Sequence, residues 1–284
     1  MSGLARSMRD ILTVAHLTLV EARRRRIVLA GAVCALAFLS VFSVAVVFAH
    51  REMVADPKTS FVERQGTLTA IMLVGFMAAN FLSVIFAILL PVDTLSGEID
   101  SGVMQTLASK PIDRGQIVLG KWAGHLLLAL AYLLLLCAGI LLVIRVVGDL
   151  VPRGAAVALP LLMLEITLSL TISVAGGARF STVTNAIVAV GIYGVSFIGG
   201  FVEQIGGFAG IAAMRMIGVL VSLVSPADSM WRLAAHHLEP EVLRSTGLLA
   251  LGAAVPTPLM VWWAAGFTAV TLLFAVSAFR RRAL

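Results

Sequence analysis

Long apolar runs, separated by short polar stretches, alternate along the chain. Six of these runs have about the 20 residues that an α-helix needs to cross a hydrocarbon core of about 30 Å. They cover residues 27–49, 68–92, 122–144, 155–175, 185–201 and 259–279. Because the runs are continuous and lack the alternation of barrel strands, they predict an all-α membrane protein with six transmembrane helices.

Residues 1–26 follow a different pattern, in which apolar and basic positions occupy opposite faces of a helix. The faces separate when the residues are placed at about 100° intervals. The apolar arc contains Leu4, Met8, Ile11, Leu12, Ala15, Leu19 and Ala22, and the polar arc contains Arg6, Arg9, Thr13, His16 and Arg23. This predicts an amphipathic interfacial helix ahead of a single transmembrane domain at residues 27–284. A soluble helix packed on a partner is the alternative interpretation.

The stretch between the fifth and sixth runs, residues 203–258, is less regular. Residues 210–224 are apolar enough to enter the membrane, but Arg215 interrupts them and Ser225 and Pro226 end them. We therefore expect a re-entrant or interfacial segment here, on the side of the membrane opposite to the N-terminus.

The distribution of charge predicts the orientation. The chain is 60% hydrophobic and 13% charged, whereas charged residues make up about a quarter of an ordinary soluble domain. With six crossings, thirteen of the 21 lysine and arginine residues fall on the side of the N-terminus, most of them beside span ends. This predicts a multi-pass protein of the cytoplasmic (inner) membrane with both termini in the cytoplasm, and it explains the net charge without nucleic acid.

The sequence lacks the motifs of several kinds of catalytic and nucleotide-binding site. The chain has no GxxxxGK[ST] phosphate loop, HExxH, CxxC or nucleophile-elbow motif. Its two cysteines, Cys34 and Cys137, both fall inside apolar runs, where they predict no disulfide framework. We therefore expect a protein that is not an enzyme and that carries no cofactor and no metal site.

Two polar residues stand out inside the predicted spans. Glu165 lies near the middle of the fourth run, where a carboxylate costs about 2.5 to 3.5 kcal/mol on insertion scales. It is a candidate for the translocation path, and the alternative is a carboxyl that joins helices through Ser169 and the hydroxyls of residues 167–173. Asn80, midway along the second run, is a second candidate, although such residues more often bond neighbouring helices.

Residues 93–121 form a polar island between two long apolar runs. Its charged residues are Asp93, Glu98, Asp100, Lys110, Asp113, Arg114 and Lys121. Its glycines and its proline indicate short helical pieces joined by tight turns. The six-span topology places the island in the cytoplasm, and a solvated loop with capped ends is the alternative to a functional role.

The island resembles the cytoplasmic signature of ABC-2 type permeases, with the NosY-like subgroup nearest. The matching residues are Gly97, Glu98, Asp100, Gly102, Leu107 and Pro111, followed by the run Arg114-Gly-Gln-Ile-Val-Leu-Gly-Lys121. Looser likeness extends to residues 225–233 and 252–282. The sequence departs from the family at Glu98-Ile99-Asp100, where consecutive glutamates are common.

This resemblance implies a function and a set of site residues. It implies that the N-terminal helix is an elbow helix, that two copies pair, and that each binds a separate ATPase subunit, which holds the ATP and magnesium. It also implies a coupling helix between spans two and three, with the ATPase contacted by Glu98, Asp100, Gly102, Pro111, Arg114, Gln116 and Lys121. The implied cargo is a copper or sulfur species, a drug, a peptide or a lipid.

Two other functions compete with a permease subunit. One is a membrane anchor that passes ATPase motion to a periplasmic accessory or maturation factor without moving a solute, using residues 203–258 as its docking surface. The other is a secondary transporter driven by protons through Glu165, which the spans favour least because they contain no matched pair of broken helices.

Overall fold

The computed structural model describes residues 2–22, 24–57, 60–94, 113–152, 154–239 and 255–281, with side chains from Ser7 onward. All regular structure within these ranges is helical, which confirms the all-α prediction. The helices are α1 (Ser2–Ala22), α2 (Arg26–Ala55), α3 (Phe61–Leu89), α6 (Arg114–Gly148), α7 (Ala155–Gly177), α8 (Thr182–Phe208), α9 (Ala212–Val224), α10 (Ala227–Leu238) and α12 (Leu259–Arg280).

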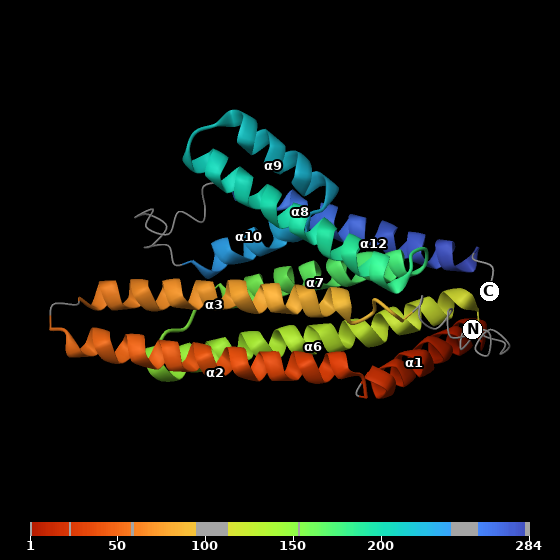
Figure 1. Cartoon of the computed structure of the whole chain (residues 1–284), viewed down its shortest axis with the longest axis horizontal. Helices are drawn as coiled ribbons and strands as arrows, with labels where there is room; N and C mark the ends of the chain where they lie inside the picture. Colours follow the sequence, from red (N-terminus) through yellow and green to blue (C-terminus); the bar gives the residue numbers. More distant parts are fainter. Residues whose placement is uncertain are drawn as a thin grey trace.

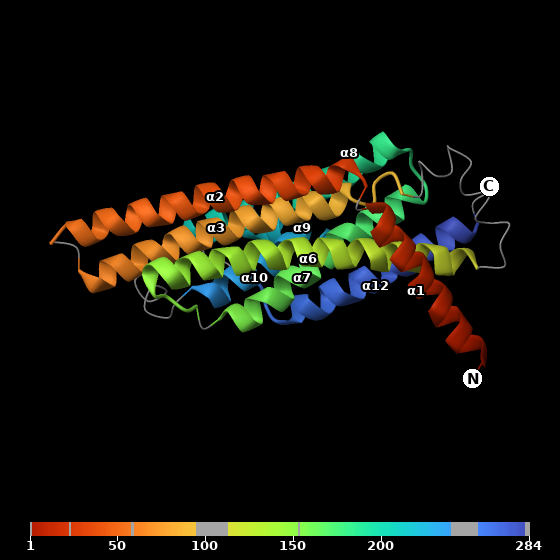
Figure 2. The same ribbon diagram turned by 90° about the horizontal axis from the view of Figure 1, so that it is seen from below.

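The prediction of six membrane spans is also confirmed. Among the described helices, α2, α3, α6, α7, α8 and α12 are long and apolar enough to cross a membrane. The long helices α2, α3 and α6 run side by side, and α7 lies at the centre, packed against α3, α6, α8, α10 and α12 (Figures 1 and 2). The start of α1 and the end of α12 lie at the same end of the molecule (Figure 1).

Several helices are longer than the apolar runs that predicted them. The polar stretch 50–67, between the first two apolar runs, is mostly helical, because α2 continues to Ala55 and α3 begins at Phe61. The Ser60 hydroxyl caps α3 by accepting from the Glu63 amide at 3.2 Å. At the other end of the molecule, α6 begins at Arg114 rather than near Trp122. The last eight residues of the polar island, 114–121, are therefore the first turns of a transmembrane helix.

Residues 203–258, between the fifth and sixth spans, are called the outer segment below, and they contain a sharply bent helix pair. Helices α9 and α10 are bent by 111° at Ser225 and Pro226, which is the geometry of a broken span or a re-entrant loop. Helix α9 folds back along α8, and α10 packs against α7 (Figure 1). The bend lies at Ser225 and Pro226, where the sequence predicted the apolar stretch 210–224 to end, and whether the pair is re-entrant stays a prediction; residues 240–254 lie outside the described ranges.

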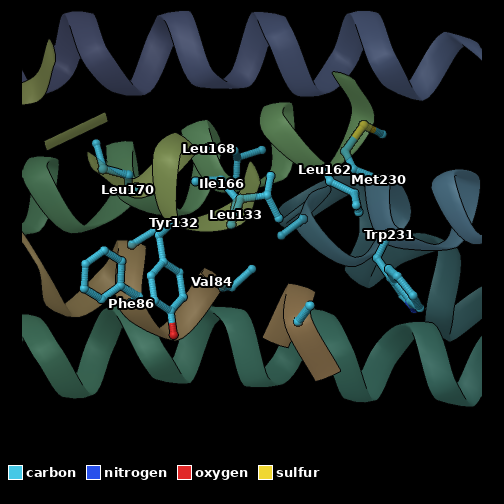
Figure 3. Packing of buried hydrophobic residues seen from close by; sticks show 14 of the residues in the cluster. Val84, Phe86, Tyr132, Leu133, Leu162, Ile166, Leu168, Leu170, Met230 and Trp231 are labelled. Atoms are coloured by element: carbon cyan, nitrogen blue, oxygen red, sulfur yellow. The ribbon is translucent and has the colours of Figure 1, made fainter. Parts of the chain in front are cut away.

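The core lies where α3, α6 and α7 meet. Phe86 of α3 stacks on Tyr132 of α6 with ring centroids 4.4 Å apart, and Leu133, Ile166 and Leu168 are fully buried around them (Figure 3). Membrane helices gain little from the hydrophobic effect between themselves, because lipid is equally apolar. Close packing and hydrogen bonds must therefore hold this bundle together.

Helix α1 crosses the first turns of α6 at a steep angle (Figure 2). Gly120 and Gly124 allow this contact, because a Cβ at Gly120 would lie 2.6 Å from the Val14 Cβ and one at Gly124 would lie 2.8 Å from the Ala15 carbonyl oxygen. Spacing of this small-xxx-small kind lets two helix backbones approach closely. The N-terminal helix is thus seated on the bundle at a defined place.

The face of α1 that packs on α6 differs from the apolar arc that the sequence predicted. Val14 and Thr18 are buried against α6, and neither was assigned to the arc. Met8 and Leu12, which were assigned to it, are each 64% exposed. One face of α1 therefore packs on protein, and its flank remains free to face lipid.

Candidate functional site

The polar island is described at its two ends. Glu98, Asp100, Gly102 and Pro111 lie within residues 95–112, outside the described residues, so their coupling role stays a prediction. The first end is residues 92–94, after α3, and the second is Asp113 with the start of α6. We call these the entry anchor and the exit anchor.

The entry anchor is joined to the break between α1 and α2 through Arg25. The Arg25 guanidinium pairs with Asp93 and also with Glu21, the latter at 2.6 Å. Burial on its own would raise the pKa of Glu21, but the hydrogen bond and positive charge of Arg25 outweigh it and lower that pKa. Burial on its own would lower the pKa of Arg25, but the two carboxylates raise it above its usual range. Glu21 and Arg25 therefore both stay charged near neutral pH.

A second set of contacts joins the entry anchor to α6. The Lys121 ammonium donates to the Thr94 carbonyl oxygen at 3.4 Å, and the Thr94 hydroxyl lies 3.3 Å from the His125 Nε2. The His125 Nδ1 lies 2.8 Å from the Lys121 carbonyl oxygen, so it carries the proton and Nε2 accepts from Thr94. Lys121 and His125 are 4% and 1% exposed. Lys121, predicted as an ATPase contact, is buried in this structure, and its contact with an ATPase stays a prediction.

The exit anchor is Asp113, which caps α6. Its carboxylate accepts from the Gly115 amide at 3.1 Å, and its own amide donates to the Gln116 side chain at 3.2 Å, which completes a capping box. The Arg280 guanidinium at the end of α12 donates to the same carboxylate at 2.5 Å. Gln116 also donates to the Ser7 hydroxyl at 2.9 Å, which links α6 to α1.

These contacts bring the two anchors to one end of the bundle. Arg114 and Gln116 lie in the first turn of α6, and Lys121 lies further along the same helix. The described ends of the island are therefore bonded to the α1–α2 junction, to α6 and to α12. The sequence reasoning missed the partners Arg25 and Arg280, since nothing in the local pattern indicates contacts across 68 and 167 residues.

The two translocation-path candidates form one pair. The Asn80 side-chain amide of α3 donates to both carboxylate oxygens of Glu165 in α7, each at 3.1 Å. Glu165 is fully buried and Asn80 is 3% exposed. Among the described residues the Ser169 hydroxyl has no hydrogen-bond partner, so it does not take the joining role suggested for it. Asn80 takes that role instead.

An ion-pair cluster in the outer segment escaped the sequence analysis. Arg232 of α10 pairs with Asp228 at 2.9 Å and with Glu203 of α8 at 2.9 Å, and it donates to the Ser222 hydroxyl of α9 at 3.1 Å. All four side chains are largely buried. The i,i+4 spacing of Asp228 and Arg232 is a local signal that could have revealed the first pair. The cluster joins α8, α9 and α10.

Comparison with known proteins agrees with this architecture. A sequence model of the family described as ABC-2 family transporter protein matches residues 12–284. The protein named "Probable ABC transporter permease protein NosY" from Stutzerimonas stutzeri is 29% identical over 235 residues, which are 72% of this chain and 77% of that protein. The protein of the same name from Pseudomonas aeruginosa is 46% identical over 57 residues, 20% of this chain and 21% of that protein. The chain therefore belongs to the ABC-2 transporter family, as a membrane-embedded permease subunit of an ABC transporter.

Proposed function

We propose that two copies of this chain form the membrane part of a transporter in the cytoplasmic membrane, with residues 93–121 and both termini in the cytoplasm. Each copy binds a separate ATPase subunit through the polar island. ATP hydrolysis, with magnesium, takes place on that subunit and drives export or delivery of a substrate. The permease chain contributes the path and the mechanical linkage rather than a catalytic centre.

The paired anchoring of the polar island carries this proposal. A merely solvated loop needs nothing beyond capped ends, whereas both ends here are also bonded to helices distant in sequence. Arg25 holds Asp93, and Arg280 holds Asp113. Because Lys121 and His125 are buried, their bonds to Thr94 are shielded from water and resist independent movement of that end. A displacement of the island would then move α1, α6 and α12 together.

The exposed faces of the outer helices support a paired arrangement. Within one copy, only 17% of an apolar 18-residue stretch of α2 and 33% of the corresponding stretch of α8 are buried. On α8, a Cβ added at Gly191 or Gly194 would meet no atom within 4 Å. Such a face accepts either lipid or the close approach of a second copy.

Co-purification with the cognate ATPase tests the proposal. The double variant Glu98→Lys with Arg114→Glu reverses two charges of the island, and we expect it to lose ATPase association and stimulation. The matched control is Arg145→Glu, an exposed charge at the opposite end of α6 that pairs with Asp149, four residues further on, at 2.6 Å. Unchanged association and ATP hydrolysis in the double variant would exclude the island as the ATPase contact.

The outer ion-pair cluster favours a second candidate function. Arg232 of α10 forms an ion pair with Glu203 of α8. The bent pair α9–α10 and α8 would therefore move as one rigid unit between the membrane and the outer surface. In this alternative the chain passes ATPase motion to a periplasmic accessory protein without solute flux. Solute uptake into sealed vesicles separates the two functions, because a mechanical transmitter hydrolyses ATP with no accompanying flux.

A further inference from the structure

An apolar groove lies between α7, α8 and α12. It has a volume of about 440 Å³, within the range of about 300 to 1,000 Å³ that is common for ligand pockets. Its lining side chains are mostly apolar, among them Ile172, Val188, Ile192, Phe267 and Phe274. Phe274 is 45% exposed, so the groove is open to the surroundings of α12. An apolar chain can therefore enter it from the membrane.

A second hollow adjoins the groove at Phe274, which lines both. It has a volume of about 640 Å³ and follows α12 past Val270, Leu273 and Ser277 to Arg281. From residue 267 to residue 277 the two hollows follow α12 for ten residues, or about 15 Å at the helical rise of about 1.5 Å per residue. This length is half of a hydrocarbon core of about 30 Å. The two hollows together therefore match the depth of one lipid leaflet.

Arginine side chains gather at the end of the hollows where α12 finishes. The Arg179 guanidinium, from the turn between α7 and α8, lies 5.1 Å from the centre of the Phe274 ring, which is a cation–π contact. Arg281 lies two helical turns beyond Phe274 and lines the second hollow. Arg280 is paired with Asp113, but within the ranges that the structure describes neither Arg179 nor Arg281 pairs with a carboxylate.

The charge of the lining is therefore of one sign. Among the described residues that line the two hollows, none is acidic. Basic pockets between transmembrane helices bind the head groups of anionic lipids, and the guanidinium group matches phosphate oxygens with two parallel hydrogen bonds. An apolar hollow one leaflet deep, with guanidinium groups at one end, thus has the chemistry of a site for an anionic amphiphile.

We propose that the groove binds an anionic phospholipid, which inserts one acyl chain between α8 and α12 and places its phosphate between Arg179 and Arg281. The assignment of this lipid to the cytoplasmic leaflet rests on the proposed function, because that proposal supplies the orientation. The end of α12 and the start of α1 lie at the same end of the molecule (Figure 1).

The site is also connected to both anchors of the polar island. Asn185 lines the groove and donates its side-chain amide to the carbonyl oxygens of Val92 at 3.3 Å and Ser173 at 2.9 Å. Arg280 lines the second hollow and holds Asp113. A lipid in this site would therefore lie beside the helices that hold both ends of the island.

Photo-labelling of the purified permease in nanodiscs, with any ATPase that co-purifies, tests the proposal. The nanodiscs consist of phosphatidylcholine with a trace of a phospholipid that carries a diazirine on one acyl chain. The head group of this probe is either anionic phosphatidylglycerol or zwitterionic phosphatidylcholine, and peptide mass spectrometry locates the adducts.

We expect the phosphatidylglycerol probe to label residues 267–274 at least tenfold more than the phosphatidylcholine probe. The reason is that each arginine near a lipid surface contributes a preference of about fivefold for anionic lipid. Equal labelling by the two probes would mean that bulk lipid fills an unselective apolar face, and it would overturn the proposal.

Charge variants connect the labelling to the named residues. Arg179→Gln and Arg281→Gln should each lower labelling by phosphatidylglycerol about fivefold and leave labelling by phosphatidylcholine unchanged. Arg179→Lys keeps the charge and should keep the preference, which separates loss of charge from loss of folding. Arg145→Gln, an exposed charge at the far end of α6, is the control. An equal loss in Arg145→Gln, or no loss in either glutamine variant of Arg179 and Arg281, would contradict the assignment.

A second copy of this chain is the other occupant that the groove would accept. A photoreactive amino acid in place of Thr271, which lines the groove, should form adducts with phosphatidylglycerol. An adduct with a second permease chain instead would assign the groove to the interface between two copies and would overturn the lipid site.

The same samples separate this inference from the proposed function. ATPase association is measured beside the labelling. An ATPase that co-purifies fully, with no preference for the anionic probe, overturns the lipid site alone. A clear preference in a chain that recruits no ATPase supports the lipid site and overturns the proposed function.

Discussion

Replacing Gly120 with alanine should lift the N-terminal helix from its seat on α6. The added Cβ would lie 2.6 Å from the Val14 Cβ and 2.9 Å from the Ile11 carbonyl oxygen. Non-bonded carbon atoms prefer separations of about 3.5 to 4.0 Å, so the two backbones must separate by roughly 1 Å. A rotamer change cannot relieve the clash, because one of the opposing atoms belongs to the backbone of α1.

The expected cost is that of overpacking a close contact, about 1 to 3 kcal/mol. Helix α1 crosses only the first turns of α6, so displacement of α1 relieves the strain at less cost than unfolding of the bundle. Since each 1.4 kcal/mol changes an equilibrium tenfold, the population with α1 displaced should rise roughly fivefold to a hundredfold. The contact between Gln116 and Ser7 would be lost in that population.

Cross-linking measures this displacement. Cysteines replace Ser7 and Gln116, Cys34 is replaced by alanine because it is exposed, and a short bifunctional thiol reagent joins the pair. Gly120→Ala should lower the cross-linking rate and the ATPase stimulation together. Gly266→Ala on α12, where an added Cβ meets nothing within 4 Å, is the control and should change neither. Equal cross-linking rates in Gly120→Ala and the parent would refute the proposed seat.

Three further predictions concern the ion pairs. Arg280→Gln frees Asp113, and because the pair is exposed it should change thermal stability by no more than about 1 kcal/mol while lowering the ATP hydrolysis that accompanies transport. Glu21 has a folded-state pKa below its ordinary 4.5, so its stabilisation of the junction between α1 and α2 is present above pH 4.5 and is lost as the pH falls through the folded value. Cross-linking of α1 to α6 should therefore decrease in acid, and Arg25→Gln should abolish this decrease. Arg232→Leu leaves two buried carboxylates without their cation and should cost about 3 to 5 kcal/mol, seen as a large drop in the melting temperature.

The spans could be predicted from the sequence because lipid imposes a simple requirement. A helix that crosses the hydrocarbon core needs about 20 apolar residues, and six such runs are present. The true start of α6 was also readable in principle, since Asp113 and Gln116 have the spacing of a capping box. Treating residues 93–121 as one unit concealed that signal, because charge and glycine content were given more weight than the capping pattern.

The contacts between helices could not be predicted in the same way. The apolar arc predicted for α1 assumes a helix that faces only lipid. Val14 is buried because Gly120, on another helix, lies against it. Glu165 was recognised as costly inside a membrane and Asn80 as a residue of the kind that bonds neighbouring helices, but their pairing depends on the rotation of α3 against α7. Local pattern identifies which residues need partners, and helix packing decides which partners they find.

Site-specific photo-cross-linking from the polar island tests the central claim most directly. A photoreactive amino acid at Asp100, inside the island, is compared with one at Trp262, which is 78% exposed on α12. On irradiation of the intact complex, the account predicts that position 100 forms an adduct with the ATPase subunit and that position 262 does not. An ATPase that co-purifies fully yet forms no adduct from position 100 would contradict the claim that the ATPase transmits force to this chain through the island.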